Sequence, residues 1–195
     1  RAALGLREDR RYLLTICRLM VWKQVDRIIR SLEGLPEDVE LLICGDGPEQ
    51  EAWQALARSL GLEQRVHFRG NVAHEFIPLH IRAADIFVLY SRYEGLSHTL
   101  VEARHVGAPI VTTDIGGNRE ILQHDQNALL VPYGDHDAFI AAVNRVLSDR
   151  ALADRLVANG RQGLEHFRWE RLVEETLDLL HEVTRIPRQE ARAQA

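Results

Sequence analysis

Two glutamates lie in a segment that combines a loop with the start of a helix. The segment SRYEGLSHTLVEARHVG, residues 91–107, follows an apolar run over residues 86–90 that is typical of a strand. Glu94 falls in the loop, the helix is expected to begin over residues 97–99, and Glu102 follows about one turn later. A helix start exposes backbone N–H groups and carries partial positive charge, which suits a phosphate. Because helical side chains lean toward the N-terminus, we expect Glu102 to lie at the same end.

A carboxylate beside a bound phosphate is repelled unless a hydrogen-bond donor lies between them. A vicinal diol meets this need because it can donate to both oxygens of one carboxylate. A phosphate joined to a ribose is such a ligand, and Glu94 would then face hydroxyls on the other side of the phosphate. The alternative for Glu102 is a capping box with Thr99, which requires no ligand. Taken alone, this segment supports the two interpretations of Glu102 about equally.

Two basic residues, Arg18 and Lys23, bracket the loop that follows the first apolar run of the chain. Permanent positive charges at the ligand end of a sheet suit a diphosphate, which carries at least two negative charges. The alternative is that both are solvated charges on a loop, and for either residue alone this alternative is the more common situation.

The elements that must position these residues alternate between apolar strands and amphipathic helices. Strands are expected over residues 12–17, 39–44, 66–69, 85–90, 109–112 and 128–131. Besides the helix near residue 97, helices are expected over 23–32, from 48 to 61, over 77–84, 118–122 and 135–147, and then over 150–167 and 169–185. Strands buried on both faces and joined by helices predict an α/β fold, a doubly wound, Rossmann-like parallel sheet of six strands.

Ligands of such sheets bind beyond the carboxyl ends of the strands. Several candidate groups follow strands directly and should therefore meet at that edge. They are Arg18, the Gly45–Pro48 turn, Arg69–Asn71, Glu94 and the Gly116–Gly117 loop. The topology alone thus predicts that these groups converge.

Composition narrows the class of protein further. The 195 residues carry a net charge of −5 with scattered basic residues, which argues against a nucleic-acid surface. No apolar run approaches the roughly 20 residues of a membrane span. Cys17 and Cys44 each sit in an apolar run, so we expect buried free thiols in a reducing compartment. With no signal peptide, this predicts a cytoplasmic protein, and the start at Arg1 rather than Met leads us to expect a fragment of a longer one.

Nothing in the sequence forms a convincing metal site or a common nucleotide motif. Asp135 and Asp137 have the D-x-D spacing of a metal-bound diphosphate site, but they open a helix after Pro132-Tyr133-Gly134. We interpret Asp135 as the N-cap of that helix and Asp137 as a partner of its dipole. The nine histidines form no ligand-like cluster, and the G-x-G-x-x-G and G-x-x-x-x-G-K-[ST] signatures are missing.

Taken together, several segments resemble a known family. Glu94 and Glu102 match the E-x7-E motif of the group 1 retaining glycosyltransferases, which have the two-domain GT-B fold and use nucleotide-diphosphate sugars. The similar segments run in the same order from about Leu13 to Val146: Arg18 with Lys23, LLICGDGPEQEAW, RVHFRGNV, RAADIFVLYS, YEGLSHTLVEA, GAPIVTTDIGGNREI and NALLVPYGD. Two positions depart from the family, since Cys17 and Gln24 stand where glycine is usual, which could alter the loop backbone.

The resemblance implies a role for each matching residue. Arg18 and Lys23, with the amides of Thr99 and Leu100, would hold the diphosphate. Glu102 would bind the ribose, Glu94 and the Gly95–Ser97 amides the donor sugar, and the backbone of residues 69–72 would border the base. The expected donor site therefore comprises Arg18, Lys23, Gly45, Arg69, Asn71, Glu94, Gly95, Leu96, Ser97, Thr99, Leu100 and Glu102.

The catalytic groups implied by the resemblance are Arg18, Lys23 and Glu94. The two cations would stabilise charge on the leaving diphosphate, and Glu94 would orient the sugar rather than act as a nucleophile. Family members generally need no metal, and no cofactor is expected besides the UDP- or GDP-linked donor substrate.

The similarity covers only the second, donor-binding domain of the family. We expect residues 1–185 to form that domain, 186–195 to be a frayed polar tail, and the N-terminal, acceptor-binding domain to be absent. The chain should then bind donor but transfer little, and any docking on a membrane face would depend on the missing domain. The alternatives are a nucleotide-sugar epimerase of the same fold and a non-catalytic nucleotide-binding module. The base, the sugar, the acceptor and the oligomeric state stay open.

Overall fold

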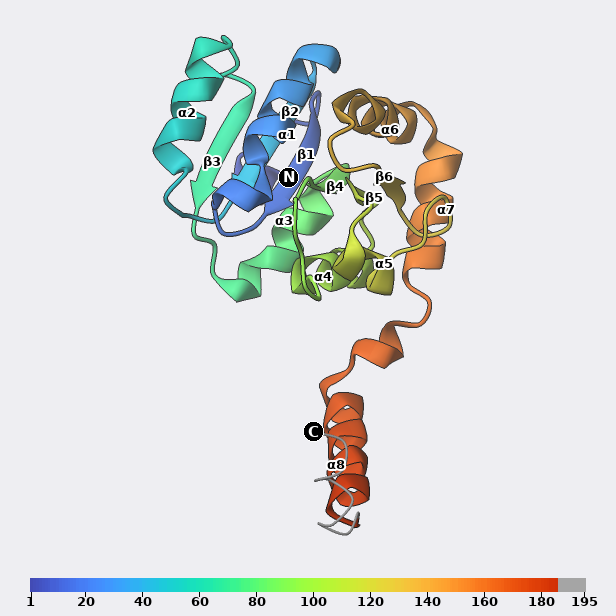
Figure 1. Ribbon diagram of the computed structural model, residues 1–195. Helices are drawn as coiled ribbons and strands as arrows, with labels where there is room; N and C mark the ends of the chain where they lie inside the picture. Colours follow the sequence, from blue (N-terminus) through green and yellow to red (C-terminus); the bar gives the residue numbers. More distant parts are fainter. Residues whose placement is uncertain (186–195) are drawn as a thin grey trace. The chain divides into compact units, whose positions relative to one another are not determined.

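A parallel sheet of six strands forms the centre of the computed structural model, which describes residues 1–185 (Figure 1). The strands are β1 (Arg11–Ile16), β2 (Val39–Cys44), β3 (Val66–Gly70), β4 (Ile86–Leu89), β5 (Ile110–Thr113) and β6 (Leu129–Val131). Every neighbouring pair is parallel, and the order is β3-β2-β1-β4-β5-β6. This confirms the predicted fold class, and each expected strand is present with its ends shifted by no more than one residue.

The strand order creates a switch point at the middle of the sheet. From β1 the chain moves outward through β2 to β3, and it then returns to place β4 on the other side of β1. The connections that leave the carboxyl ends of β1 and β4 therefore run toward opposite sides. A crevice opens between such connections, and it is the usual ligand site of an open α/β sheet.

Helices form a layer on each side of the sheet (Figure 1). One layer holds α1 (Val25–Ser31), α2 (Gln50–Ser59) and α6 (His136–Ser148), and the other holds α3 (Ile77–Ala83), α4 (His98–Val106) and α5 (Gly116–Ile121). α7 (Arg150–Gly160) contacts both α6 and α4. Val25, Ile28, Ile29 and Leu32, which share one helical stripe in the sequence, are all fully buried. Burial of this stripe against the strands is what holds α1 on the sheet.

A capping side chain sets the start of α6, and a left-handed residue sets the start of α1. Asp135 is the N-cap of α6, as predicted, and its Oδ1 accepts a hydrogen bond of 2.9 Å from the amide of Ala138. α1 begins at Val25 rather than at Lys23, because residues 21–23 form a 3-10 turn and Gln24 then takes a left-handed conformation with φ 45°. Gln24 is one of the two positions where the family has glycine, and the backbone there has the angle that glycine favours.

One predicted helix is wrong in its extent. The segment expected to be helical over residues 150–167 ends as α7 at Gly160, and a 3-10 turn, Leu164–Phe167, follows. Gly163 between them has φ 71°, a left-handed conformation that cannot continue a right-handed helix. The described chain forms two compact units, divided between Gln162 and Gly163.

The second unit contains α8 (Trp169–Arg185), which begins and ends where predicted. Its apolar side chains, including Trp169, Leu172, Leu177 and Leu180, recur at helical spacing. No helix within the described residues is long and apolar enough to cross a bilayer. The predicted polar tail, residues 186–195, lies outside the described residues.

Candidate functional site

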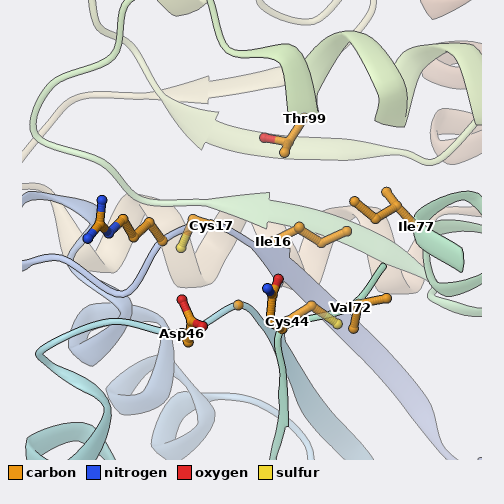
Figure 2. Close-up of a pocket in the computed structure, with 10 residues that line it drawn as sticks. Ile16, Cys17, Cys44, Asp46, Val72, Ile77 and Thr99 are labelled. Atoms are coloured by element: carbon orange, nitrogen blue, oxygen red, sulfur yellow. The ribbon is translucent and has the colours of Figure 1, made fainter. Parts of the chain in front are cut away.

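A cavity of about 430 Å³ lies at the carboxyl ends of the strands, where the topology predicts a ligand site. It is lined by the end of β1, the end of β2, the segment between β3 and α3, and the start of α4. The lining residues are Ile16, Cys17, Arg18, Cys44, Gly45, Asp46, Asn71, Val72, Ile77 and Thr99. Thr99 lies on one side of the cavity, and Asp46, Cys44 and Val72 lie on the other (Figure 2).

The floor of the cavity depends on a close approach of two loops. Gly45 has φ 128°, and a Cβ atom placed on it would lie 1.9 Å from the carbonyl oxygen of Cys17. The amide of Cys17 donates to the carbonyl of Cys44 over 3.1 Å, and the amide of Leu19 donates to the carbonyl of Asp46 over 2.6 Å. Only glycine fits at position 45 while these hydrogen bonds hold the two loops together.

The two predicted cations occupy different environments. Arg18 lines the cavity and is exposed, and no group within residues 1–185 accepts a hydrogen bond from its guanidinium. Lys23 instead donates from Nζ to Oε1 of Glu94 over 2.6 Å, and the side chains are only 18% and 8% exposed. An ammonium has three N–H donors, so Lys23 can hold Glu94 and still donate to an anion.

Lys23 and Glu94 are close enough to Cys17, which lines the cavity, for both charges to influence its thiol. Burial raises the pKa of Cys17 to about 11 and the pKa of Cys44 likewise to about 11. Both are free thiols, as predicted. At neutral pH they are therefore protonated, and neither is a reactive thiolate.

The loop that carries Glu94 is supported from two sides. The amide of Arg92 donates to the carbonyl of Trp22 over 2.8 Å, which ties this loop to the one after β1. At the start of α5, a Cβ atom on Gly117 would lie 2.0 Å from the carbonyl oxygen of Gly95. The loop thus rests directly on the α5 backbone, so the position of Glu94 depends on both neighbours.

The start of α4 supplies part of the predicted anion site. Ser97 is the N-cap, and Thr99 lines the cavity. The amide of Leu100 donates to the carbonyl of Ser97 over 3.1 Å, whereas the amide of Thr99 has no acceptor in the part of the chain that the structure describes. Of the two amides that the sequence indicated, Thr99 therefore has the free donor.

The capping-box alternative for Glu102 is wrong. With Ser97 as the N-cap, Glu102 is the fifth residue of the helix and lies beyond the third position that a capping box requires. Its Oε1 instead accepts a hydrogen bond from Nε2 of His74 over 2.8 Å. His74 lies in the 3-10 turn His74–Phe76, between β3 and α3.

Not every predicted residue faces the cavity. Asn71 lines it, but the guanidinium of Arg69 donates to the carbonyl of Leu4 over 3.4 Å and is not among the lining groups. Sequence reasoning placed the turn that contains Asp46 at this edge but left Asp46 out of the donor site, and it missed His74. Asp46 could have been included, because it belongs to the turn directly after β2, whereas no local pattern connects His74 with Glu102. Within residues 1–185, no three His, Cys, Asp or Glu side chains are placed to hold one metal ion.

Comparisons of the sequence with known proteins find one family and several relatives. The family model described as glycosyl transferases group 1 matches residues 1–163. An uncharacterized glycosyltransferase of Methanocaldococcus jannaschii is 29% identical over 182 residues, which cover 92% of this chain and 47% of that protein. A GDP-mannose-dependent alpha-(1-6)-phosphatidylinositol monomannoside mannosyltransferase of Mycobacterium tuberculosis is 32% identical over 186 residues, 88% of this chain and 48% of that protein.

Solved structures show the same fold. Sucrose-phosphate synthase from Thermosynechococcus elongatus superposes with a TM-score of 0.86 at 28% identity, over 94% of this chain and 48% of that one. Anabaena HepE in complex with UDP-glucose superposes with a TM-score of 0.84 at 25% identity, over 93% of this chain and 51% of that one. The chain thus spans about half the length of these proteins. None of the matches described here is an epimerase.

Proposed function

Because the chain belongs to the group 1 glycosyl transferases, we propose that it binds the nucleotide-diphosphate sugar donor of a sugar-transfer reaction. The observation that supports the proposal is the cavity lined by Arg18, Gly45, Asn71 and Thr99, with Lys23 and Glu94 paired in the adjoining loops and Glu102 one helical turn after Thr99. These groups are scattered over more than 80 positions of the sequence, and only the switch point of the sheet brings them together.

The diphosphate is assigned to the part of the cavity beside Arg18. The Arg18 guanidinium is exposed there and has no acceptor among the described residues, so its donors are available to an anion. Thr99 adds a free backbone amide at the positive end of α4. Lys23 adds a further positive charge, and its ammonium can donate to the diphosphate while it holds Glu94.

The remaining parts of the donor fall on either side of the diphosphate. Glu102 would accept hydrogen bonds from the ribose hydroxyls, and the backbone near Asn71 and Val72 would border the base. The loop after β4, with Glu94 and the amides of residues 95–97, would hold the sugar. This loop rests on the start of α5, which keeps it in place as the donor binds.

Transfer breaks the bond between the anomeric carbon and the diphosphate oxygen, and the electron pair leaves with the diphosphate. Arg18 and Lys23 would stabilise the negative charge that develops there. The acceptor oxygen forms the new bond to the anomeric carbon, its proton passes to the departing diphosphate oxygen, and the anomeric configuration is retained. Glu94 is suited to orienting the sugar, because Lys23 already binds one of its oxygens at 2.6 Å. In the whole enzyme, the acceptor would be bound mainly by a domain that corresponds to the half of each relative that this chain does not cover.

The donor base is open between uridine and guanosine. HepE was solved with UDP-glucose, and the mycobacterial relative is a GDP-mannose-dependent enzyme. The test is a calorimetric titration of the chain with UDP and with GDP in the absence of metal, repeated with Arg18→Ala and Glu102→Ala. We expect one nucleotide to bind and both substitutions to weaken it by about tenfold or more, which corresponds to about 1.4 kcal/mol.

A matched control is Arg30→Ala, which removes an exposed arginine from α1 that has no part in the site. It should leave nucleotide affinity unchanged. Equal affinity of the wild type and of both site variants for the nucleotide, or no binding to the wild type at all, would contradict the proposal.

A further inference from the structure

The hydrogen bond between His74 and Glu102 connects two elements that border the cavity. His74 lies between Val72 and Ile77, both of which line the cavity, and Glu102 lies one helical turn after the lining residue Thr99. The Nε2–Oε1 distance is 2.8 Å, across 28 positions of the sequence. The pair therefore spans the gap between the β3–α3 segment and α4.

The geometry leaves half of the Glu102 carboxylate available. Oε1 accepts from His74, whereas Oε2 has no hydrogen-bond partner within residues 1–185. Because a carboxylate only accepts hydrogen bonds, Nε2 of His74 must carry the proton in this contact. The imidazole then restricts the rotation of the carboxylate and directs Oε2 in one orientation.

We propose that His74 is a positioning residue for the donor ribose. It holds the Glu102 carboxylate through Oε1, so that the carboxylate is oriented to accept from the two ribose hydroxyls. Without His74 the carboxylate would sample several rotamers, and ordering it on binding would cost affinity. The inference rests on the proposed function, because it assigns His74 a role only if Glu102 binds the ribose.

A surface ion pair with no role in binding is the competing explanation. His74 is 85% exposed and Glu102 is 29% exposed, and pairs with such exposure contribute little to stability. Neither explanation predicts a large effect of His74 on folding. They differ in whether His74 is energetically coupled to the ribose hydroxyls.

The experiment measures that coupling directly. Calorimetric titrations with UDP, GDP and their 2′,3′-dideoxy counterparts are made on five proteins. These are the wild type, His74→Ala, His74→Gln, Glu102→Ala and the His74→Ala/Glu102→Ala double variant. For the nucleotide that binds, the dissociation constant of the 2′,3′-dideoxy form divided by that of the ordinary form reports what the ribose hydroxyls contribute to affinity. Thermal unfolding of each variant shows whether it is folded.

We expect a ratio on the order of tenfold in the wild type, which corresponds to about 1.4 kcal/mol, and a fall to about threefold or less in His74→Ala. Gln also carries an N–H donor, so His74→Gln should recover part of the ratio. In Glu102→Ala the ratio should approach one, and adding His74→Ala to it should change nothing further, because His74 acts through Glu102. His105→Ala, an exposed histidine later on α4, is the matched control and should keep the wild-type ratio.

Two kinds of failure are distinguishable. If Glu102→Ala lowers the ratio but His74→Ala keeps it at the wild-type value, or weakens both nucleotides equally, the positioning role is refuted while the proposed function stands. If the wild type binds no nucleotide, or if Glu102→Ala keeps the full ratio, the ribose assignment itself fails and the inference fails with it.

Discussion

Arg104 provides the sharpest test of how α4 is held in the fold. It lies on α4, two residues after Glu102, and is only 5% exposed. Its guanidinium donates to three backbone carbonyls, those of Gly160 at 2.8 Å, Ile121 at 2.8 Å and Gln162 at 2.7 Å. One side chain thus ties α4 to the ends of α5 and α7.

Replacing Arg104 with Met keeps most of the buried volume but removes the donors of these three hydrogen bonds. The hydrogen bonds to Gly160 and Ile121 are buried, whereas the one to Gln162 is only partly buried. A buried carbonyl left without a partner costs about 1–3 kcal/mol, and the variant regains the cost of burying a guanidinium. We therefore expect Arg104→Met to lower the free energy of unfolding by about 3 kcal/mol. The measurement is urea-induced unfolding followed by circular dichroism, with the midpoint and slope fitted separately.

Arg119→Met is the matched control, because Arg119 pairs with Asp114 at the surface and its side chain is 64% exposed. It should leave the free energy of unfolding nearly unchanged, because solvent screens an exposed ion pair. A cost below about 1 kcal/mol for Arg104→Met would show that water replaces the lost donors, and it would refute the argument that Arg104 holds α4 in place.

Two further predictions concern the backbone and the thiols. Gln24→Gly should raise the free energy of unfolding by about 0.5–1 kcal/mol, because glycine relieves the strain of a left-handed backbone with φ 45°, even after its greater freedom in the unfolded chain is subtracted. Gln24→Ala keeps the strain and is the control. Equal unfolding midpoints for the two variants would contradict this reasoning. Burial raises the pKa of Cys17 and Cys44 to about 11, so the contribution of these two thiols to folding stability should be constant below the unfolded thiol pKa of about 8.5 and fall as pH rises from there through about 11. Thermal unfolding across pH 8–11 checks this, with a Cys17→Ala/Cys44→Ala variant as the control that should lose less stability over the same range.

The sequence predicted the fold well because the fold depends on local patterns. Each strand is a short apolar run, and runs buried on both faces and separated by amphipathic helices leave few arrangements other than a parallel sheet. The carboxyl-end rule then placed Arg18, Gly45, Asn71 and Thr99 around one cavity, where the structure has them. Asp135 was recognised as an N-cap because a cap involves only the next three residues.

Other features were decided by contacts between distant segments. Glu94 pairs with Lys23 across 71 positions, and Glu102 pairs with His74 across 28. The burial of Arg104 likewise depends on carbonyls at the ends of two later helices. Local spacing carries no information about such partners.

The chain by itself therefore determined which elements form and which edge of the sheet holds the site, since hydrophobic periodicity and capping act over a few residues. Only the tertiary structure decided which side chain each carboxylate binds and which donors stay free for a ligand. Those outcomes depend on how loops from different strands meet at the switch point, and packing sets that geometry after the elements have formed.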